Sequence, residues 1–206
     1  MGRALRWWLW GGLAALLGCD DPSVAPTPTG AELYGEYCAV CHGAKGEGYA
    51  APQANALANP DFLAAASEDF LKAGVVKGRP GTSMSAWGAS EGGPLSEAVV
   101  TELVKHLTSW RRDAPTTLDE RPLAGDVARG AALYAERCRD CHGDKGQGGS
   151  ALSLANPEFL RTATNGYLRQ GLRRGRRDTP MSAYQELLGE QELEDVVAFV
   201  RGLQAR

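Results

Sequence analysis

The sequence predicts an all-α protein built from two tandem copies of one helical unit. Apolar residues recur at helical spacing in several segments, and no strand-like alternation of apolar and polar residues occurs among the 206 residues. The pentapeptide Cys38-Ala39-Val40-Cys41-His42 occurs again as Cys138-Arg139-Asp140-Cys141-His142, one hundred positions later. Because matching segments surround both pentapeptides, the repeat predicts two small domains.

Both pentapeptides have the pattern C-x-x-C-H, which is typical of covalent haem attachment. In this pattern two thiols form thioether bonds to the porphyrin, and the adjacent imidazole binds the iron. The sequence therefore predicts two haem c groups. The expected thioether residues are Cys38, Cys41, Cys138 and Cys141, and the expected iron ligands are His42 and His142.

Two other kinds of site use paired cysteines, namely structural zinc sites and redox-active dithiols. Zinc requires four ligands, and His106 is the one histidine outside the two pentapeptides, so each cysteine pair lacks partners. A dithiol site leaves both adjacent histidines without a role. The haem interpretation accounts for all of these residues.

Size and composition are those of a globular protein with small domains. Hydrophobic residues make up 43% of the chain and charged residues 23%, and the formal net charge is −3. This mild charge gives no indication of nucleic-acid binding. Each repeat has about 80 residues, too few to bury a large core alone. A buried haem would supply much of the missing apolar volume.

The first nineteen residues, 1–19, have the features of a secretory signal. Arg3 and Arg6 precede an apolar run that is shorter than the ~20 residues needed to span a bilayer. Residues 16–19 (Leu-Leu-Gly-Cys) resemble a bacterial lipobox, which predicts acylation of Cys19 and attachment to the membrane through lipid. The alternative is a plain signal peptide with an incidental cysteine.

The rest of the chain divides into a tether, two domains and a linker. Residues 20–29 are rich in proline and threonine, which is typical of an extended tether. Residues 111–125 contain two prolines and are expected to link the domains. The domains themselves are predicted at 30–110 and 126–206.

Each domain is expected to contain the same series of helices. Asn59 and Asn156, each followed by proline, predict a capped helix start. A second short helix follows in each copy and is expected to end at Gly78 or Gly175. The last helix of each copy carries its apolar residues on one face.

The motifs resemble those of class I c-type cytochromes. The resemblance covers nearly all of residues 30–110 and 126–204, and the two-domain layout is similar to diheme cytochromes of the c4 kind. It implies that each domain is a class I cytochrome c fold wrapped around one covalently attached haem.

The resemblance also implies a close crossing between the helix before each haem motif and the last helix of the domain. A glycine and an aromatic residue four positions later make this crossing, because glycine lets two backbones approach. The partner on the last helix is Phe199 in copy two and His106 in copy one, for which we expect a packing role. A backbone carbonyl next to a proline usually orients the haem histidine, which suggests Pro52 in copy one. The crossing residues are Gly30, Tyr34, Gly130 and Tyr134.

Met84 and Met181 are expected to be the second axial ligands of the two irons. They are the only methionines after Met1, and they occupy equivalent places in the two copies. Methionine is often core filler, but two in register favour ligation. Thioether ligation raises the potential of a haem relative to two histidines and leaves no open position for oxygen or peroxide.

Four residues near these methionines are candidate contacts of the haem propionates. Trp87 and Tyr184 follow the two methionines by three positions, and each ring carries one polar group. Arg79 and Arg176 precede them by five positions, and a guanidinium group suits a carboxylate. The alternatives are core filling for the two rings and solvated loop positions for the arginines.

Charge differs between the two domains. Residues 31–110 carry nine acidic and five basic side chains, whereas residues 126–206 carry eleven acidic and twelve basic ones. Five arginines precede Met181, and two interpretations remain open: a solvated face, or a docking patch for an acidic redox partner. The five are Arg169, Arg173, Arg174, Arg176 and Arg177.

Two six-coordinate haems predict an electron carrier and not an enzyme. We expect a lipid-anchored protein on the periplasmic side of a bacterial inner membrane, where it passes single electrons between redox proteins of a respiratory chain. Its expected partners are an electron donor, an electron acceptor and the membrane, without a small-molecule substrate or nucleic acid. The alternatives are a diheme enzyme of the peroxidase or thiosulfate-oxidising type, and a fixed electron-transfer subunit of a larger oxidoreductase.

Overall fold

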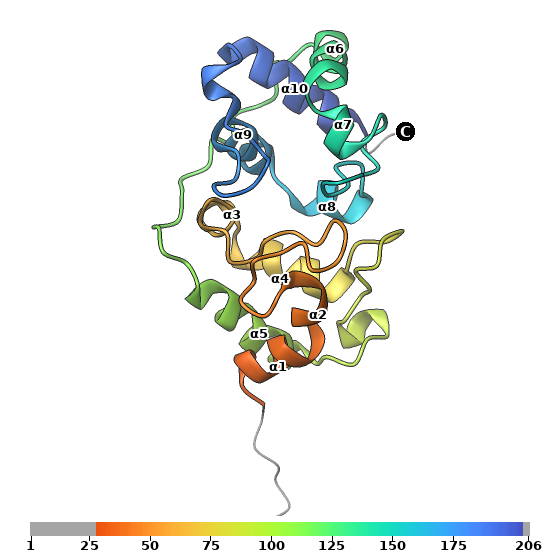
Figure 1. The fold of residues 1–206 in the computed structure, drawn as a ribbon, viewed down its shortest axis with the longest axis vertical. Helices are drawn as coiled ribbons and strands as arrows, with labels where there is room; N and C mark the ends of the chain where they lie inside the picture. Colours follow the sequence, from red (N-terminus) through yellow and green to blue (C-terminus); the bar gives the residue numbers. More distant parts are fainter. Residues whose placement is uncertain (1–27, 204–206) are drawn as a thin grey trace, which may run out of the picture.

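The computed structural model describes residues 28–203, which form two helical lobes stacked end to end (Figure 1). The signal, the lipobox with Cys19 and most of the tether lie outside the described residues. The lower lobe is the first repeat. Its elements are α1 (Gly30–Tyr37), α2 (Ala39–His42), α3 (Pro60–Ala65), α4 (Glu68–Lys77), the 3-10 helix η1 (Ala89–Glu91) and α5 (Glu97–Ser109).

The upper lobe repeats this series of helices. A connecting segment runs along one side of the molecule from α5 to the second lobe (Figure 1). Within the described part, the closest approach to a strand is an isolated bridge between Gly88 and Leu95. The predicted all-α fold with two tandem domains is therefore confirmed. The upper elements are α6 (Val127–Arg137), α7 (Arg139–His142), α8 (Pro157–Thr162), α9 (Asn165–Arg174), η2 (Tyr184–Glu186) and α10 (Glu190–Gly202).

Local sequence determines where these helices start and stop. Asn59 caps α3 by accepting hydrogen bonds from the backbone N–H groups of Asp61 and Phe62, both at 3.1 Å. Asn156 caps α8 in the same way. Helices α4 and α9 end at glycines with φ of 61° and 62°, a conformation that side chains disfavour.

The predicted helix crossings are present in both lobes. A Cβ atom on Gly30 would lie 2.5 Å from the carbonyl oxygen of Glu102 on α5, so only glycine permits this approach. The ring of Tyr34 lies 5.7 Å from the ring of His106. His106 also contacts Trp110 edge-on at 4.8 Å, which confirms its packing role.

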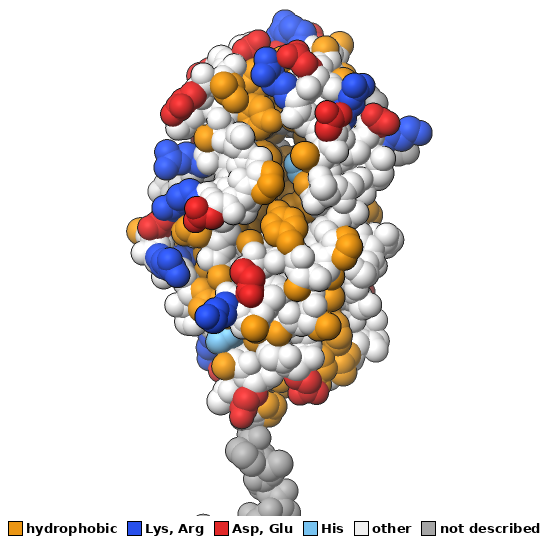
Figure 2. All heavy atoms as spheres, viewed as in Figure 1, with side chains coloured by type: hydrophobic (Ala, Val, Ile, Leu, Met, Phe, Trp, Pro, Cys, Tyr) orange, Lys and Arg blue, Asp and Glu red, His pale blue; other side chains and the backbone are white. Residues whose placement is uncertain are grey.

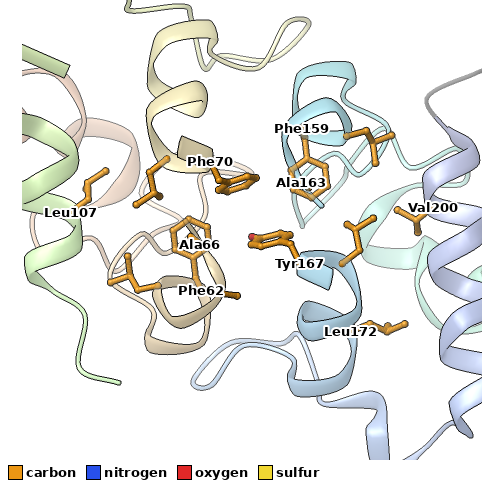
Figure 3. Close-up of a cluster of buried hydrophobic side chains, with 14 of the residues drawn as sticks. Phe62, Ala66, Phe70, Leu107, Phe159, Ala163, Tyr167, Leu172 and Val200 are labelled. Carbon is orange, nitrogen blue, oxygen red and sulfur yellow. The ribbon is translucent and has the colours of Figure 1, made fainter. Parts of the chain in front are cut away.

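Aromatic side chains from both lobes form the contact between them (Figure 3). Phe70 of α4 stacks on Tyr167 of α9, with ring centroids 4.7 Å apart and planes at 28°. These two residues occupy equivalent positions in the repeat. Phe62 packs edge-on against Phe70 at 6.3 Å, and Phe159 against Tyr167 at 6.2 Å. Each such pair contributes roughly 0.5–1.5 kcal/mol beyond area burial.

The capping asparagines also hold the two lobes together. The Nδ2 group of Asn59 donates to the carbonyl of Arg177 at 2.7 Å. The Nδ2 group of Asn156 donates to the carbonyl of Pro80 at 2.9 Å. Because Pro80 and Arg177 are themselves equivalent positions, the interface has approximate two-fold symmetry.

An ion pair breaks this symmetry. Asp61 is 8% exposed and accepts hydrogen bonds from the backbone N–H of Arg177, at 2.7 Å, and from its guanidinium Nε, at 3.0 Å. Burial raises the pKa of Asp61, but the bonds from Arg177 outweigh it and lower the pKa below the ordinary value. Pro80 has no backbone N–H, and Glu158 pairs with Arg161 on its own helix. Among the described residues, this interdomain ion pair is therefore present in only one half of the interface.

The linker is bound to the second lobe by Arg169. This side chain is 1% exposed and forms an ion pair with Glu194 at 2.6 Å. Its Nη1 donates to the main-chain carbonyls of Asp119 and Arg121, at 2.7 and 2.8 Å. A buried cation is tolerated here because the carboxylate and the carbonyls replace water.

Four of the five arginines before Met181 have partners within the described structure. Arg173 pairs with Glu190, and the guanidinium of Arg176 lies over the ring of Tyr167, 5.8 Å from its centroid. Arg169 is buried, so the solvated-face interpretation is wrong for this residue. Arg177 pairs across the interface, but Arg174 and Arg177 are both exposed, and the docking-patch interpretation stays a prediction. Long-range partners, invisible in the local sequence, decide where these side chains lie.

We expect Asp61→Asn to weaken the interface, because it leaves the Arg177 guanidinium without its buried partner. The predicted loss is roughly 1–2 kcal/mol of unfolding free energy. Urea unfolding of the haem-loaded protein, followed by far-UV circular dichroism, measures it. Since the folded pKa lies below the ordinary 3.8, the contribution of Asp61 is present above that pH and is lost as the pH falls below it.

Glu158→Gln provides a matched control for this variant. Glu158 occupies the equivalent position in the second repeat, but its exposed pair with Arg161 stays within one helix, so we expect a loss of about 0.5 kcal/mol or less. Equal losses for the two variants would contradict an interdomain role for Asp61.

Candidate haem sites

Each C-x-x-C-H motif forms one helical turn directly after the first helix of its domain. Cys38 ends α1 and begins α2, and its carbonyl accepts a hydrogen bond from the backbone N–H of His42 at 2.9 Å. Cys138 and His142 make the same 2.9 Å bond at the start of α7. This turn brings two thiols and one imidazole together. None of the four described cysteines forms a disulfide.

Both motif histidines are buried and oriented by a loop carbonyl. Nδ1 of His42 lies 2.9 Å from the carbonyl oxygen of Asn55, and Nδ1 of His142 lies 3.0 Å from that of Leu152. Since a carbonyl only accepts, Nδ1 carries the proton and Nε2 keeps its lone pair for a metal. Burial lowers the pKa of both imidazoles, which favours the neutral, ligating form.

These acceptors differ from the one expected next to Pro52. In the first domain the acceptor is Asn55, three residues further along the loop. In the second domain Leu152 takes the role without any neighbouring proline. The hydrogen bond depends on where the loop carbonyl lies, and several loop sequences can present a carbonyl there.

A tyrosine fixes the residue after each histidine, a contact that the sequence analysis missed. The hydroxyl of Tyr34 donates to the carbonyl of Gly43 at 2.7 Å, and the hydroxyl of Tyr134 donates to that of Gly143 at 2.8 Å. Burial raises the pKa of Tyr134 to about 12, so its hydroxyl stays a donor at neutral pH. In both copies the glycine follows the tyrosine by nine residues, and this repeated spacing could have indicated the contact.

The two methionine loops have the same backbone hydrogen bonds. The backbone N–H of Arg79 donates to the carbonyl of Met84 at 2.7 Å, and that of Arg176 donates to the carbonyl of Met181 at 2.8 Å. Each bond closes the loop directly after a helix that ends in glycine. The equivalent positions of the two methionines in sequence are therefore also equivalent in structure.

The second domain contains a cavity of about 330 Å³ that brings its predicted haem residues together. Cys138, Cys141, His142 and Met181 all line it. Apolar side chains from α8, α9 and α10 line much of the remainder, and Figure 2 shows hydrophobic side chains gathered in a hollow of the upper half. Thiols, an imidazole and a thioether around an apolar space fit a haem.

The candidate propionate contacts lie near this region but have other partners. Arg176 and Tyr184 line the cavity, and the Tyr184 hydroxyl donates to the carbonyl of Arg137 at 3.0 Å. In the first domain, Arg79 lies over the ring of Phe70 and Trp87 packs edge-on against Tyr37. The propionate contacts of all four residues stay a prediction.

The zinc and dithiol interpretations find no support. Residues 28–203 contain no group of three or more His, Cys, Asp or Glu side chains that could hold a metal ion. Burial raises the pKa of Cys38 and Cys138 to about 11, so neither thiol is ionised at neutral pH as reactive dithiols require.

Comparison with known families identifies one match that covers both domains. The family described as "Cytochrome C oxidase, cbb3-type, subunit III" matches residues 25–107 and 125–200. The matched ranges contain both histidine–methionine pairs, His42 with Met84 and His142 with Met181.

Two curated relatives are named "Cbb3-type cytochrome c oxidase subunit CcoP". The one from Azospirillum sp. (strain B510) is 33% identical over 135 residues, which cover 61% of this chain and 42% of the relative. The one from Azospirillum brasilense is 25% identical over 191 residues, which cover 84% of this chain and 61% of the relative. The chain thus spans less than two thirds of either relative.

A solved structure has the same fold. A chain of the Kuenenia stuttgartiensis reducing HAO-like protein complex superimposes with a TM-score of 0.55 at 19% identity, covering 86% of this chain and 96% of that chain. At this identity the likeness concerns the fold alone. Among residues 28–203, none of the helices has the length and apolar character that crossing a membrane requires.

Met84→Ala and Met181→Ala test the assignment of the axial ligands. Each is expected to remove about half of the weak near-infrared band from sulfur to ferric iron, because one of two haems loses its thioether. Each should also lower one midpoint potential by a fraction of the ~0.8 V range that axial ligands span. Spectroelectrochemical titration measures both effects.

Ser85→Ala is a suitable control, because Ser85 is an exposed neighbour of Met84. It should leave the band and both potentials unchanged. If either methionine variant keeps the full band, the corresponding iron has a different sixth ligand.

Proposed function

Because the chain belongs to the cbb3-type cytochrome c oxidase subunit III family, we propose that it is an electron-transfer subunit of such an oxidase. The match across both haem domains carries this proposal. The main sequence expectation was a diheme cytochrome that passes single electrons between redox complexes, and the alternatives were a diheme enzyme and a fixed electron-transfer subunit of a larger oxidoreductase. Family membership favours the fixed subunit.

The chain is a diheme c-type cytochrome with two haem c groups. The histidine–methionine pairs are His42 with Met84 and His142 with Met181. A bound haem supplies reversible one-electron oxidation and reduction of its iron. The residues of the chain orient the imidazoles, exclude water with apolar walls and hold the two domains against each other. We propose that Cys38, Cys41, Cys138 and Cys141 form the thioether bonds.

Two protein ligands on each iron favour electron transfer over catalysis. A peroxidase or an oxidase centre needs an iron position that substrate can reach. In the second domain, His142 and Met181 line the same cavity, so each would supply one ligand to the iron of a haem held there. This arrangement supports a carrier that passes electrons to a separate site of oxygen reduction.

The N-terminal region is expected to hold the protein at the membrane. We propose cleavage after residue 18, acylation of Cys19 and a tether of residues 20–29 that leads to domains at 30–110 and 126–206. The functional domains would then lie on the periplasmic side, close to a membrane-embedded partner.

The proposed partnership predicts a stable complex in membranes. Affinity purification of the tagged full chain in mild detergent is expected to recover a cbb3-type oxidase, and loss of the chain should lower oxygen consumption by that oxidase several-fold. Met181→Ala serves as a control, since it should still recover the oxidase but deliver electrons more slowly. A chain that purifies alone, with oxygen consumption unaffected by its loss, would contradict the proposal.

Cys19→Ser tests the proposed anchor separately. Without a thiol, residue 19 cannot be acylated, so the haem protein should move from the membrane fraction to the soluble periplasmic fraction. Haem absorbance in the two fractions measures the change. To separate the anchor from the partner, the comparison is made in cells with and without the oxidase. Retention of the variant on membranes that lack the oxidase would rule out an anchor at Cys19.

A further inference from the structure

The cavity of the second haem site has a wall that comes from the first domain. Besides the residues of its own domain, it is lined by residues of the loop that precedes α3 and of α3 itself. A haem held in the second domain would therefore contact a surface supplied by the first. These residues are Tyr49, Asn55, Ala56, Asn59 and Phe62.

One of these residues also belongs to the first haem site. The main-chain carbonyl of Asn55 accepts the hydrogen bond from Nδ1 of His42, at 2.9 Å. The same residue lines the cavity that contains His142 and Met181. Asn55 thus lies between the iron ligand of one domain and the haem cavity of the other, without any intervening residue.

The loop that carries Asn55 is bonded to its own domain and closely approaches the second. On the first-domain side, the backbone N–H of Ala51 donates to the carbonyl of Cys41 at 3.0 Å, and that of Gly48 donates to the carbonyl of His42 at 2.8 Å. On the second-domain side, a Cβ atom added to Gly148 would lie 2.8 Å from Oε1 of Gln53. The loop is therefore hydrogen-bonded within its own domain and lies close against the neighbouring one.

The repeat shows how the loop of Asn55 differs from its counterpart in the second domain. The segment Gly46–Ala58 is three residues longer than its counterpart Gly146–Ala155. The extra residues precede Asn55, and the equivalent position in the second copy is Leu152. Leu152 also lines the second cavity, and its carbonyl orients His142. A residue with a polar side chain and one with an apolar side chain, from equivalent positions, therefore both line one haem cavity.

We propose that Asn55 is a positioning residue that couples the two haem sites. Its carbonyl holds the ligand His42 of the first haem, and its side chain sets the polarity of the wall around the second haem. The midpoint potential of the second haem then depends on a residue of the first domain. The inference rests on the two haems and on the geometry, and it does not depend on the oxidase partnership.

The predicted change follows from the charge of the iron. Ferric haem carries one more positive charge than ferrous haem, so a more apolar wall disfavours the ferric form and raises the midpoint potential. Asn55→Leu keeps the carbonyl for His42 and removes the amide, so it should raise the potential of the second haem. Asn55→Asp adds a negative charge and should lower that potential.

The experiment is a spectroelectrochemical titration of the purified haem-loaded protein and its variants. The two potentials are first assigned with Met84→Ala and Met181→Ala. We expect opposite shifts of the second haem in Asn55→Leu and Asn55→Asp, each larger than any shift of the first haem. Leu152→Asn, the matched variant from the other loop, should shift the second haem downward.

The outcomes are distinct. If both Asn55 variants shift only the first haem, the loop serves its own domain and the proposal is wrong. If neither haem shifts, Asn55 has no role in setting a potential and the proposal is again wrong. If Asn55→Asp does not fold, Asn55→Leu and Leu152→Asn still provide the test. Their expected shifts in the midpoint potential of the second haem have opposite signs. Because the titration uses isolated protein, failure to bind an oxidase cannot produce any of these results.

Discussion

The hydrogen bond from each motif histidine to a loop carbonyl is the contact on which the rest of the structure depends. It fixes the proton on Nδ1, keeps Nε2 available for iron, and determines how the loop after the motif folds. In the first domain the same loop continues to Asn59, which caps α3 and bonds to the other domain. Iron ligation, helix initiation and domain contact are therefore linked through the single segment from His42 to Asn59.

The two domains use the same residues for contact, and their differences make the two haem sites unequal. Stacked Phe70 and Tyr167 and the two capping asparagines are repeated features. The Asp61–Arg177 pair and the longer loop around Asn55 are present in one direction only. A duplicated unit thus supplies the architecture, and a small number of substitutions and an insertion distinguish the environments of the two irons.

Features encoded by neighbouring residues were predictable, and features that depend on distant partners were not. The haem motifs and the asparagine caps were predictable because each depends on adjacent residues, and the glycine at each helix crossing was implied by the resemblance to class I c-type cytochromes. Arg169 looked like part of a charged surface, yet it is buried because Glu194 and the linker carbonyls surround it. Asn55 carried no local signal, since its role arises only when the second domain lies beside it.

The pattern of contacts between the lobes also describes how such a protein can arise. A face on which Asn59 meets position 177, while Asn156 meets position 80, is self-complementary, which is the property of an isologous dimer interface. A single repeat with this face could pair with an identical copy. Joining two copies through one linker makes that encounter intramolecular and raises the effective concentration of the partner, on the order of millimolar for short flexible connections. Once association is assured by the covalent connection, each half is free to acquire residues that a symmetric dimer would have to carry twice.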